Sequence, residues 1–162
     1  GIELPVHSEI IGSENEYFYR NKMEFTFSNK RWLTTEEVQS EVDIPDKDAL
    51  GFHVPGMFDK VINLNNCYLQ KEPSNAIRLS VKQFADENGL TFFDIRNHEG
   101  LLRNLMIRTS STNDLMVLVQ FYEKDEKNIN LLMEHLKTSF PEITSLLYII
   151  NQKQTTLCMT KK

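Results

Sequence analysis

Cysteine is scarce in this chain, and long apolar runs are missing. Only Cys67 and Cys158 occur among the 162 residues, far apart, and the N-terminal GIELPVHSEI lacks the basic and apolar regions of a secretory signal. Both facts argue against a disulfide framework and favour reduced thiols. No run approaches the roughly 18 apolar residues that span a bilayer. We therefore expect a soluble cytoplasmic protein with no membrane partner.

Positive charge is also in short supply. The formal net charge is −5, whereas an autonomous nucleic-acid-binding domain usually carries an excess of Lys and Arg. The 36–48 region is acidic, and four cations lie close together near the start of the chain: Arg20, Lys22, Lys30 and Arg31. If RNA is the partner, the contact must be local or shared with other parts of a larger protein.

The familiar catalytic motifs are absent from the sequence. It contains no Gly-rich phosphate loop, no Gly-x-Ser-x-Gly elbow, no His-Glu-x-x-His helix and no cysteines at zinc spacing. His135 falls near the end of a predicted helix, where a positive charge would favour the helix dipole. His53 and His98 are more suggestive, but an unpaired loop histidine is more often structural or solvated than catalytic.

The most informative stretch is Tyr17 to Phe27, YFYRNKMEFTF. Its alternation predicts a strand from Tyr19 onward, because successive side chains of a strand point to opposite faces. Four residues are predicted on the buried face, namely Tyr19, Met23, Phe25 and Phe27. The other face carries Arg20, Lys22, Glu24 and Thr26. The residues alone favour an ordinary half-buried strand whose cations are merely solvated.

Helical signals occur at three places. Thr34 and Glu37 fit a capping box for a short helix near residues 35–41. A longer helix is predicted over 74–88, with Ser74 or Asn75 as its cap and Gly89 ending it in the left-handed conformation. The apolar period of residues 126–140 predicts another, which Pro141 stops.

The remaining apolar segments are predicted strands. They lie at residues 51–57, 59–64, 100–109, 115–123 and 143–151, with a weak last strand at 155–160. Pro55-Gly56 and residues 110–114 are the turns of two hairpins. Strands and helices in this order predict a single α+β domain of two layers, with a mostly antiparallel sheet and two helices on one face.

Three blocks of the sequence resemble a known family. They are YRNKMEFTF at 19–27, GFH at 51–53 followed by VIN at 61–63 and Cys67, and GLLRNLMIR at 100–108. Their order and spacing are similar to those of the RNA uracil-5-methyltransferases, above all the members that methylate large-subunit ribosomal RNA. The resemblance covers residues 1 to about 152, which correspond to only the middle of such an enzyme.

The resemblance implies a parent protein of three parts. An N-terminal OB-type barrel and a C-terminal Rossmann-like domain that holds S-adenosyl-L-methionine would flank this central domain, and both are missing here. Residues 1–16 are then a lead-in, 17–152 the central RNA-substrate-binding domain and 153–162 a divergent tail; a start at Gly1 rather than Met fits an excised piece. The family's attacking cysteine and proton-abstracting glutamate belong to the C-terminal domain. We therefore expect no catalytic residue here and no activity in isolation; Cys158 lacks the surrounding motif.

The resemblance makes Cys67 a candidate ligand. In family members with a 4Fe-4S cluster, three cysteines precede the block that matches Tyr19, and a fourth stands where Cys67 stands. The first three are absent here, and a single thiolate cannot hold a cluster that needs four protein ligands. Cys67 is thus a candidate fourth iron–sulfur ligand in the parent only, or a plain core cysteine.

The resemblance also implies RNA contacts. The candidate residues are Arg20, Lys22 and His53, with Arg103 and Arg108 less firmly assigned, because Arg103 shares a face with apolar residues and could form a buried structural ion pair instead. Such cations would contact phosphates without reading bases. The expected partner is ribosomal RNA, alternatively tRNA, and the isolated chain should be monomeric. A non-enzymatic RNA-binding or protein-interaction module is the alternative function.

Overall fold

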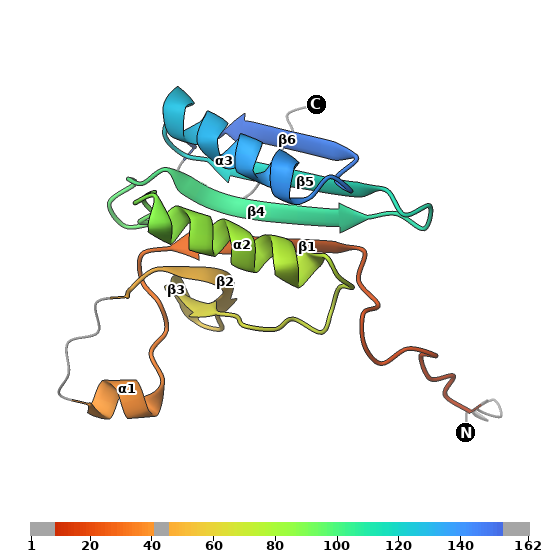
Figure 1. Ribbon diagram of the computed structural model, residues 1–162. Helices are drawn as coiled ribbons and strands as arrows, with labels where there is room; N and C mark the ends of the chain where they lie inside the picture. Colours follow the sequence, from red (N-terminus) through yellow and green to blue (C-terminus); the bar gives the residue numbers. More distant parts are fainter. Residues whose placement is uncertain (1–8, 41–45, 154–162) are drawn as a thin grey trace, which may run out of the picture.

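Two helices pack on one face of a six-stranded sheet in the computed structural model, which describes residues 9–40 and 46–153 (Figure 1). The strands are β1 (Lys22–Ser28), β2 (Ala49–Val54), β3 (Met57–Asn63), β4 (Leu102–Thr109), β5 (Leu115–Phe121) and β6 (Ser145–Ile150). Their order in the sheet is β3-β2-β1-β4-β5-β6, and every pair is antiparallel except β5 with β6. The predicted α+β class is confirmed. The weak strand expected at 155–160 lies outside the described residues.

The central strand β1 is anchored by its apolar face. Met23, Phe25 and Phe27 are buried, as the alternation predicts, while Lys22 and Glu24 at the alternate positions are exposed. The prediction for Tyr19 is wrong: its side chain is 59% exposed, and the strand begins only at Lys22. The backbone of Phe18 has a positive φ of 57°, so the extended conformation that alternation requires is interrupted before Tyr19.

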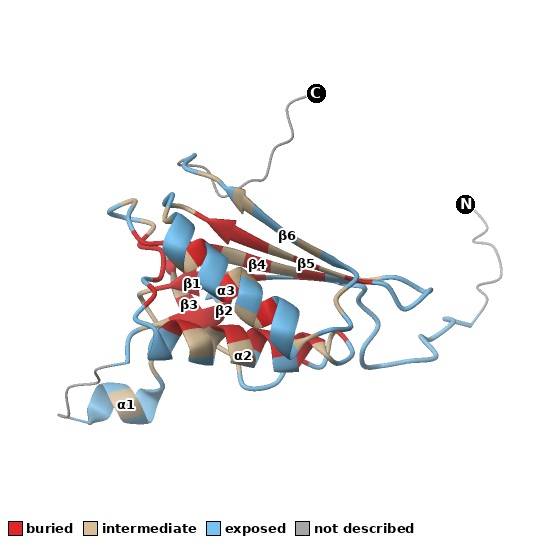
Figure 2. Cartoon of the chain, turned by 45° about the horizontal axis from the view of Figure 1, so that its top comes forward, coloured by how far each residue is buried: buried red, intermediate tan, exposed pale blue. Residues whose placement is uncertain are grey.

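Helices α2 (Ser74–Glu87) and α3 (Glu126–Ser139) supply the other layer. Each buries an apolar stripe at helical spacing, formed by Ile77, Val81 and Ala85 in α2 and by Ile129, Leu132 and Leu136 in α3. Figure 2 shows the buried residues concentrated between these helices and the sheet. None of the helices in the described ranges is long and apolar enough to cross a membrane.

The helix ends follow the sequence signals in part. Short helix α1 (Thr35–Gln39) begins with the predicted capping box of Thr34 and Glu37. Gly89, just after α2, has the predicted positive φ of 64°. The prediction of Ser74 or Asn75 as the N-cap of α2 is wrong, because the N-cap residue is Pro73, which makes no side-chain hydrogen bond there. The Glu72 carboxylate instead accepts a hydrogen bond from the backbone N–H of Ala76 in the first turn.

His135 lies near the end of α3, as predicted, but its contacts favour packing over a charge at the helix end. Its ring stacks on Phe84 with 4.3 Å between ring centroids, and its Nε2 lies 2.8 Å from the Ser80 hydroxyl. Desolvation lowers the pKa of His135, although Glu87 opposes the shift. A lowered pKa favours the neutral imidazole, so His135 contributes packing between α2 and α3 rather than charge.

The core makes a direct prediction about stability. Phe25 is fully buried and its ring stacks on Phe52 with 5.4 Å between centroids. Phe25→Ala should lower the free energy of unfolding by about 3–5 kcal/mol, because it removes a large buried side chain and leaves a cavity. Phe58→Ala, at a strand position 60% exposed, is the matched control and should cost less than about 1 kcal/mol. Urea unfolding measures both, and equal losses would contradict this description of the core.

Candidate nucleic-acid interface

The side of the sheet opposite the helices carries the charged residues of β1 and β4. Side chains alternate along each strand, so Lys22 and Glu24 on β1 face away from the helices while the residues between them are buried. The same holds for Arg108 on β4, which alternates with the buried Ile107 and is exposed. These residues belong to a helix-free face of the sheet.

Lys22 and Arg108 lie directly opposite each other in the β1–β4 pair. Directly opposed residues of an antiparallel pair have Cβ atoms about 4.5–5.5 Å apart, and like charges in such positions repel. Within residues 9–40 and 46–153, no carboxylate forms an ion pair with Lys22, Arg108 or the nearby Arg20. These cations therefore form no ion pair within the described residues, although Glu24 lies on the same face of β1 as Lys22.

Arg20 precedes β1 and lies at the same end of the sheet. Its backbone N–H donates to the carbonyl of Leu69 over 2.8 Å, and the Asn21 carbonyl accepts the N–H of Thr109, the neighbour of Arg108. Arg20 also lines a groove of about 600 Å³ together with Lys71. We call the four cations Arg20, Lys22, Lys71 and Arg108 the basic end of the sheet.

Polar groups of the β4–β5 turn line the same groove. Ser110, Ser111 and Asn113 supply hydroxyls and an amide. Three carboxylates also lie there, but two have internal partners: Asp114 accepts hydrogen bonds from the hydroxyls of Thr112 and Ser110, which lower its pKa, and Glu72 accepts from Asn75 and Ala76. The remaining one is Glu142. The groove thus combines two cations and three carboxylates with hydrogen-bonding groups, so a phosphate would be contacted by Arg20 and Lys71 individually rather than by a net positive charge.

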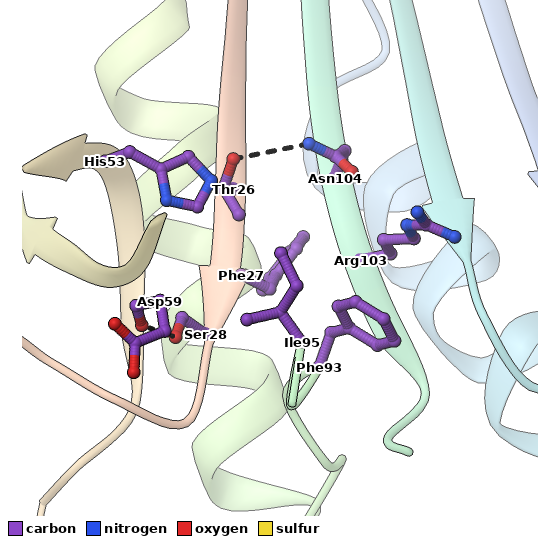
Figure 3. A pocket seen from close by; sticks show the side chains of 9 residues that line it. All are labelled: Thr26, Phe27, Ser28, His53, Asp59, Phe93, Ile95, Arg103 and Asn104. Carbon is purple, nitrogen blue, oxygen red and sulfur yellow. Dashed lines mark hydrogen bonds between the residues drawn. The ribbon is translucent and has the colours of Figure 1, made fainter. Parts of the chain in front are cut away.

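His53 lies on the helix-free face but beside Thr26 rather than in the groove (Figure 3). With Asp59 and Asn104 it lines a cavity of only about 20 Å³, which has no room for a base. Desolvation lowers the pKa of His53, although the Asp59 carboxylate raises it. His53 therefore favours the neutral form near pH 7 and can donate one hydrogen bond, but it does not add a full charge to the basic end.

Arg103 does not reach the surface. A bulge between Leu102 and Asn104 accompanies a side chain that is only 2% exposed, and Figure 3 shows it directed away from His53. Its Nη1 donates to the carbonyls of Asn151 and Lys153, both over 2.7 Å, and the guanidinium lies 4.9 Å from the centroid of the Phe93 ring. These contacts favour the structural alternative for Arg103, with carbonyls and aromatic rings as partners, over a contact with RNA.

Lys30 and Arg31, close to Arg20 in sequence, do not belong to the basic end. The Lys30 ammonium pairs with Asp94 at 3.2 Å, and Arg31 pairs with Glu37 at 2.8 Å. Burial alone would raise the pKa of Asp94, but hydrogen bonds from Asn29, from two backbone N–H groups and from Lys30 hold it well below its usual range. Both cations are therefore committed to structural ion pairs.

Cys67 is a buried thiol in the core, 6% exposed. The side chain of Asn75 holds its backbone on both sides: Asn75 Oδ1 accepts the Cys67 N–H over 2.8 Å, and Nδ2 donates to the Cys67 carbonyl. In the part of the chain that the structure describes, no three His, Cys, Asp or Glu side chains come together to hold a metal ion. This environment fits a core cysteine and gives the iron–sulfur prediction no support. Cys158 lies outside the described residues.

Sequence reasoning missed Lys71 and three exposed aromatic residues, Tyr17, Phe18 and Tyr68, of which Phe18 lines the same groove as Lys71. Tyr17 and Phe18 belong to the aromatic run that precedes β1, so the run itself was a signal. Lys71 and Tyr68 reach the site only through the fold, because backbone hydrogen bonds join residues 18–20 to residues 68–69.

Comparison with known proteins identifies relatives in bacteria, although the chain matches no protein-family model. It is 52% identical to a protein of Bacteroides thetaiotaomicron and 50% identical to one of Porphyromonas gingivalis, over 94% of this chain in both cases. A third relative, from Chlorobaculum tepidum, is 38% identical over 96% of the chain. All three are named as uncharacterized RNA methyltransferases. The chain spans about a third of their length, 33–34%.

A solved structure shares the fold. The chain superposes with a TM-score of 0.63 on the Pyrococcus abyssi tRNA (uracil-54, C5)-methyltransferase in complex with S-adenosyl-L-homocysteine. The match covers 92% of this chain and 31% of that protein, at 18% sequence identity. At this identity the likeness establishes the architecture, not the substrate.

The opposed cations predict an unusual response to mutation. Arg108→Gln should raise the free energy of unfolding by up to roughly 0.5 kcal/mol at low salt, because it relieves repulsion from Lys22, and the gain should shrink as salt screens the charges. Arg96→Gln is the control, since Arg96 pairs with Asp59 at 2.7 Å and its removal should lower stability. Urea unfolding at two salt concentrations separates the cases; a decrease of stability in Arg108→Gln would show that the two cations do not repel.

Proposed function

This chain belongs to the family of its bacterial relatives named RNA methyltransferases, and from that premise we propose that it is the substrate-binding central domain of an S-adenosylmethionine-dependent RNA uracil-5-methyltransferase. The observation that carries the proposal is the basic end. A chain of net charge −5 gathers Arg20, Lys22 and Arg108 at one end of its sheet, with no ion-pairing carboxylate among the described residues. These side chains are available to contact the phosphates of a polyanion, although Glu24 on β1 and the groove carboxylates Glu72, Asp114 and Glu142 offset their charge.

The proposed division of labour rests on the resemblance to the uracil-5-methyltransferases. It implies that the attacking cysteine, the proton-abstracting glutamate and the site for S-adenosylmethionine, which supplies the methyl group, belong to the rest of the protein, and the chain spans about a third of the length of its relatives. This domain then binds and orients the strand. Contacts from the basic end to phosphates fix the register of the RNA, and neutral His53 can donate to a phosphate or a 2′-hydroxyl. Holding the uridine in place is itself a contribution to the rate.

The proposed substrate is large-subunit ribosomal RNA in the cytoplasm. Its support is the similarity of the blocks at 19–27 and 100–108 to the ribosomal RNA enzymes of the family. Transfer RNA is the second candidate, and the Pyrococcus abyssi protein, named as a tRNA methyltransferase, is the observation that keeps it open. Methylation assays of the full-length protein on the two RNA classes distinguish them.

Removing the cations tests the binding role. In the full-length protein, Arg20→Ala combined with Lys22→Ala should weaken RNA binding and make the dependence of log K on log salt shallower, by about 0.7 for each phosphate that the variant no longer neutralises. Methylation at limiting RNA should fall in parallel. The control is Lys124→Ala with Lys137→Ala, which removes two exposed lysines outside the basic end. Unchanged affinity and salt slope in the first variant would exclude these residues from the RNA interface.

The assignment of the methyl-donor site is tested by ligand binding. The isolated chain should show no shift in melting temperature with S-adenosylmethionine, whereas the full-length protein should be stabilised, since a ligand that binds only the folded state at 100 times its Kd adds about 2.7 kcal/mol. Differential scanning fluorimetry compares the two. A clear shift for the isolated chain would mean that the donor site includes these residues.

A further inference from the structure

Three aromatic side chains form an exposed cluster next to the basic end. Tyr17, Phe18 and Tyr68 are 61%, 40% and 59% exposed. Their ring centroids lie 5.9–6.4 Å apart, in tilted or edge-on pairs. Large apolar rings are costly to leave in water, so an exposed cluster of three marks a surface that binds something.

The backbone holds this cluster in place. The N–H of Phe18 donates to the Tyr68 carbonyl over 2.8 Å, which ties the segment before β1 to the loop before α2. Phe18 has a positive φ, which is rare for a bulky residue. Tyr68 directly follows Cys67, whose backbone N–H and carbonyl are both hydrogen-bonded to the side chain of Asn75. The three rings therefore lie on two segments that backbone hydrogen bonds hold together.

The cluster is continuous with the basic end. Tyr17, Phe18 and Tyr68 line a hollow of about 560 Å³, and Phe18 also lines the groove of about 600 Å³ that contains Arg20 and Lys71. Volumes of 300–1,000 Å³ are typical of small-molecule sites. Arg20 and Lys71 form no ion pair among the described residues, although Glu72, Asp114 and Glu142 also line their groove. Ring faces beside these two cations complement a strand that carries flat bases on a chain of phosphates, because aromatic rings stack on bases while Arg and Lys contact the backbone.

We propose that Tyr17, Phe18 and Tyr68 form a stacking platform for an unpaired base of the RNA strand whose phosphates contact Arg20 and Lys71. This inference rests on the proposed function and adds a base-binding subsite to it. Because every base has a π face, the platform tolerates sequence and holds a flanking nucleotide rather than selecting the uridine. It keeps the strand engaged at a distance from the reacting base.

Stacking and phosphate contacts are separable by experiment. The full-length protein with Tyr17→Ala and Tyr68→Ala is titrated with a short oligouridylate and with an abasic ribose-phosphate strand of equal length. We expect the variant to bind oligouridylate roughly 5- to 100-fold more weakly, with an unchanged salt slope, and to bind the abasic strand like the wild type. Oligouridylate containing 5-iodouridine should photo-crosslink to Tyr17 or Tyr68, as located by mass spectrometry.

Two controls keep the result specific. Tyr17→Phe with Tyr68→Phe retains the rings and should retain affinity. Tyr148→Ala removes a tyrosine that is 49% exposed on β6 and should leave the RNA affinity unchanged.

Three outcomes would contradict the proposal. Equal weakening of binding to oligouridylate and to the abasic strand, together with a lower melting temperature, would show that the cluster packs against protein, which overturns the platform. Wild-type affinity in the alanine variant also overturns it, and the proposed function stands if the Arg20 and Lys22 variant still binds RNA more weakly. If the wild type binds neither strand, both proposals fail.

Discussion

The burial of the apolar face of β1 fixes the direction of Lys22 and Arg108 in the interface. Met23, Phe25 and Phe27 can be buried beneath α2 and α3 in only one register, because a slip of one residue would turn all of them to solvent. The same register sends Lys22 to the opposite face and sets it against Arg108. Core packing and the placement of the cations are therefore one constraint, enforced by the two-residue period of the strand.

The chain separates its cations by use. Lys30 and Arg31 form ion pairs with Asp94 and Glu37, whereas the cations of the basic end form no ion pair among the described residues. Like charges across a strand pair cost stability, and a protein selected for stability alone would remove one of them. Retaining both accords with a surface that gains its counter-charge from a bound polyanion.

The segment before β1 extends this surface with apolar groups. Tyr17 and Phe18 are presented beside Tyr68 because backbone hydrogen bonds join two segments that lie far apart in sequence. Phosphate contacts are sensitive to salt and stacking is not, so a surface that uses both can hold a strand firmly with few cations. In our proposal this domain binds the RNA strand, and the rest of the enzyme carries out the methyl transfer.

The sequence by itself determined the local elements: the period of β1, the capping box at Thr34, the end of α2 at Gly89 and the α+β class. These depend on neighbouring residues and on fixed periods of 2 and 3.6. Only the tertiary structure decided the parallel pairing of β6 with β5, the burial of Arg103 and the exposure of Tyr19. Each depends on contacts between distant segments or on a single backbone angle, which local patterns do not encode.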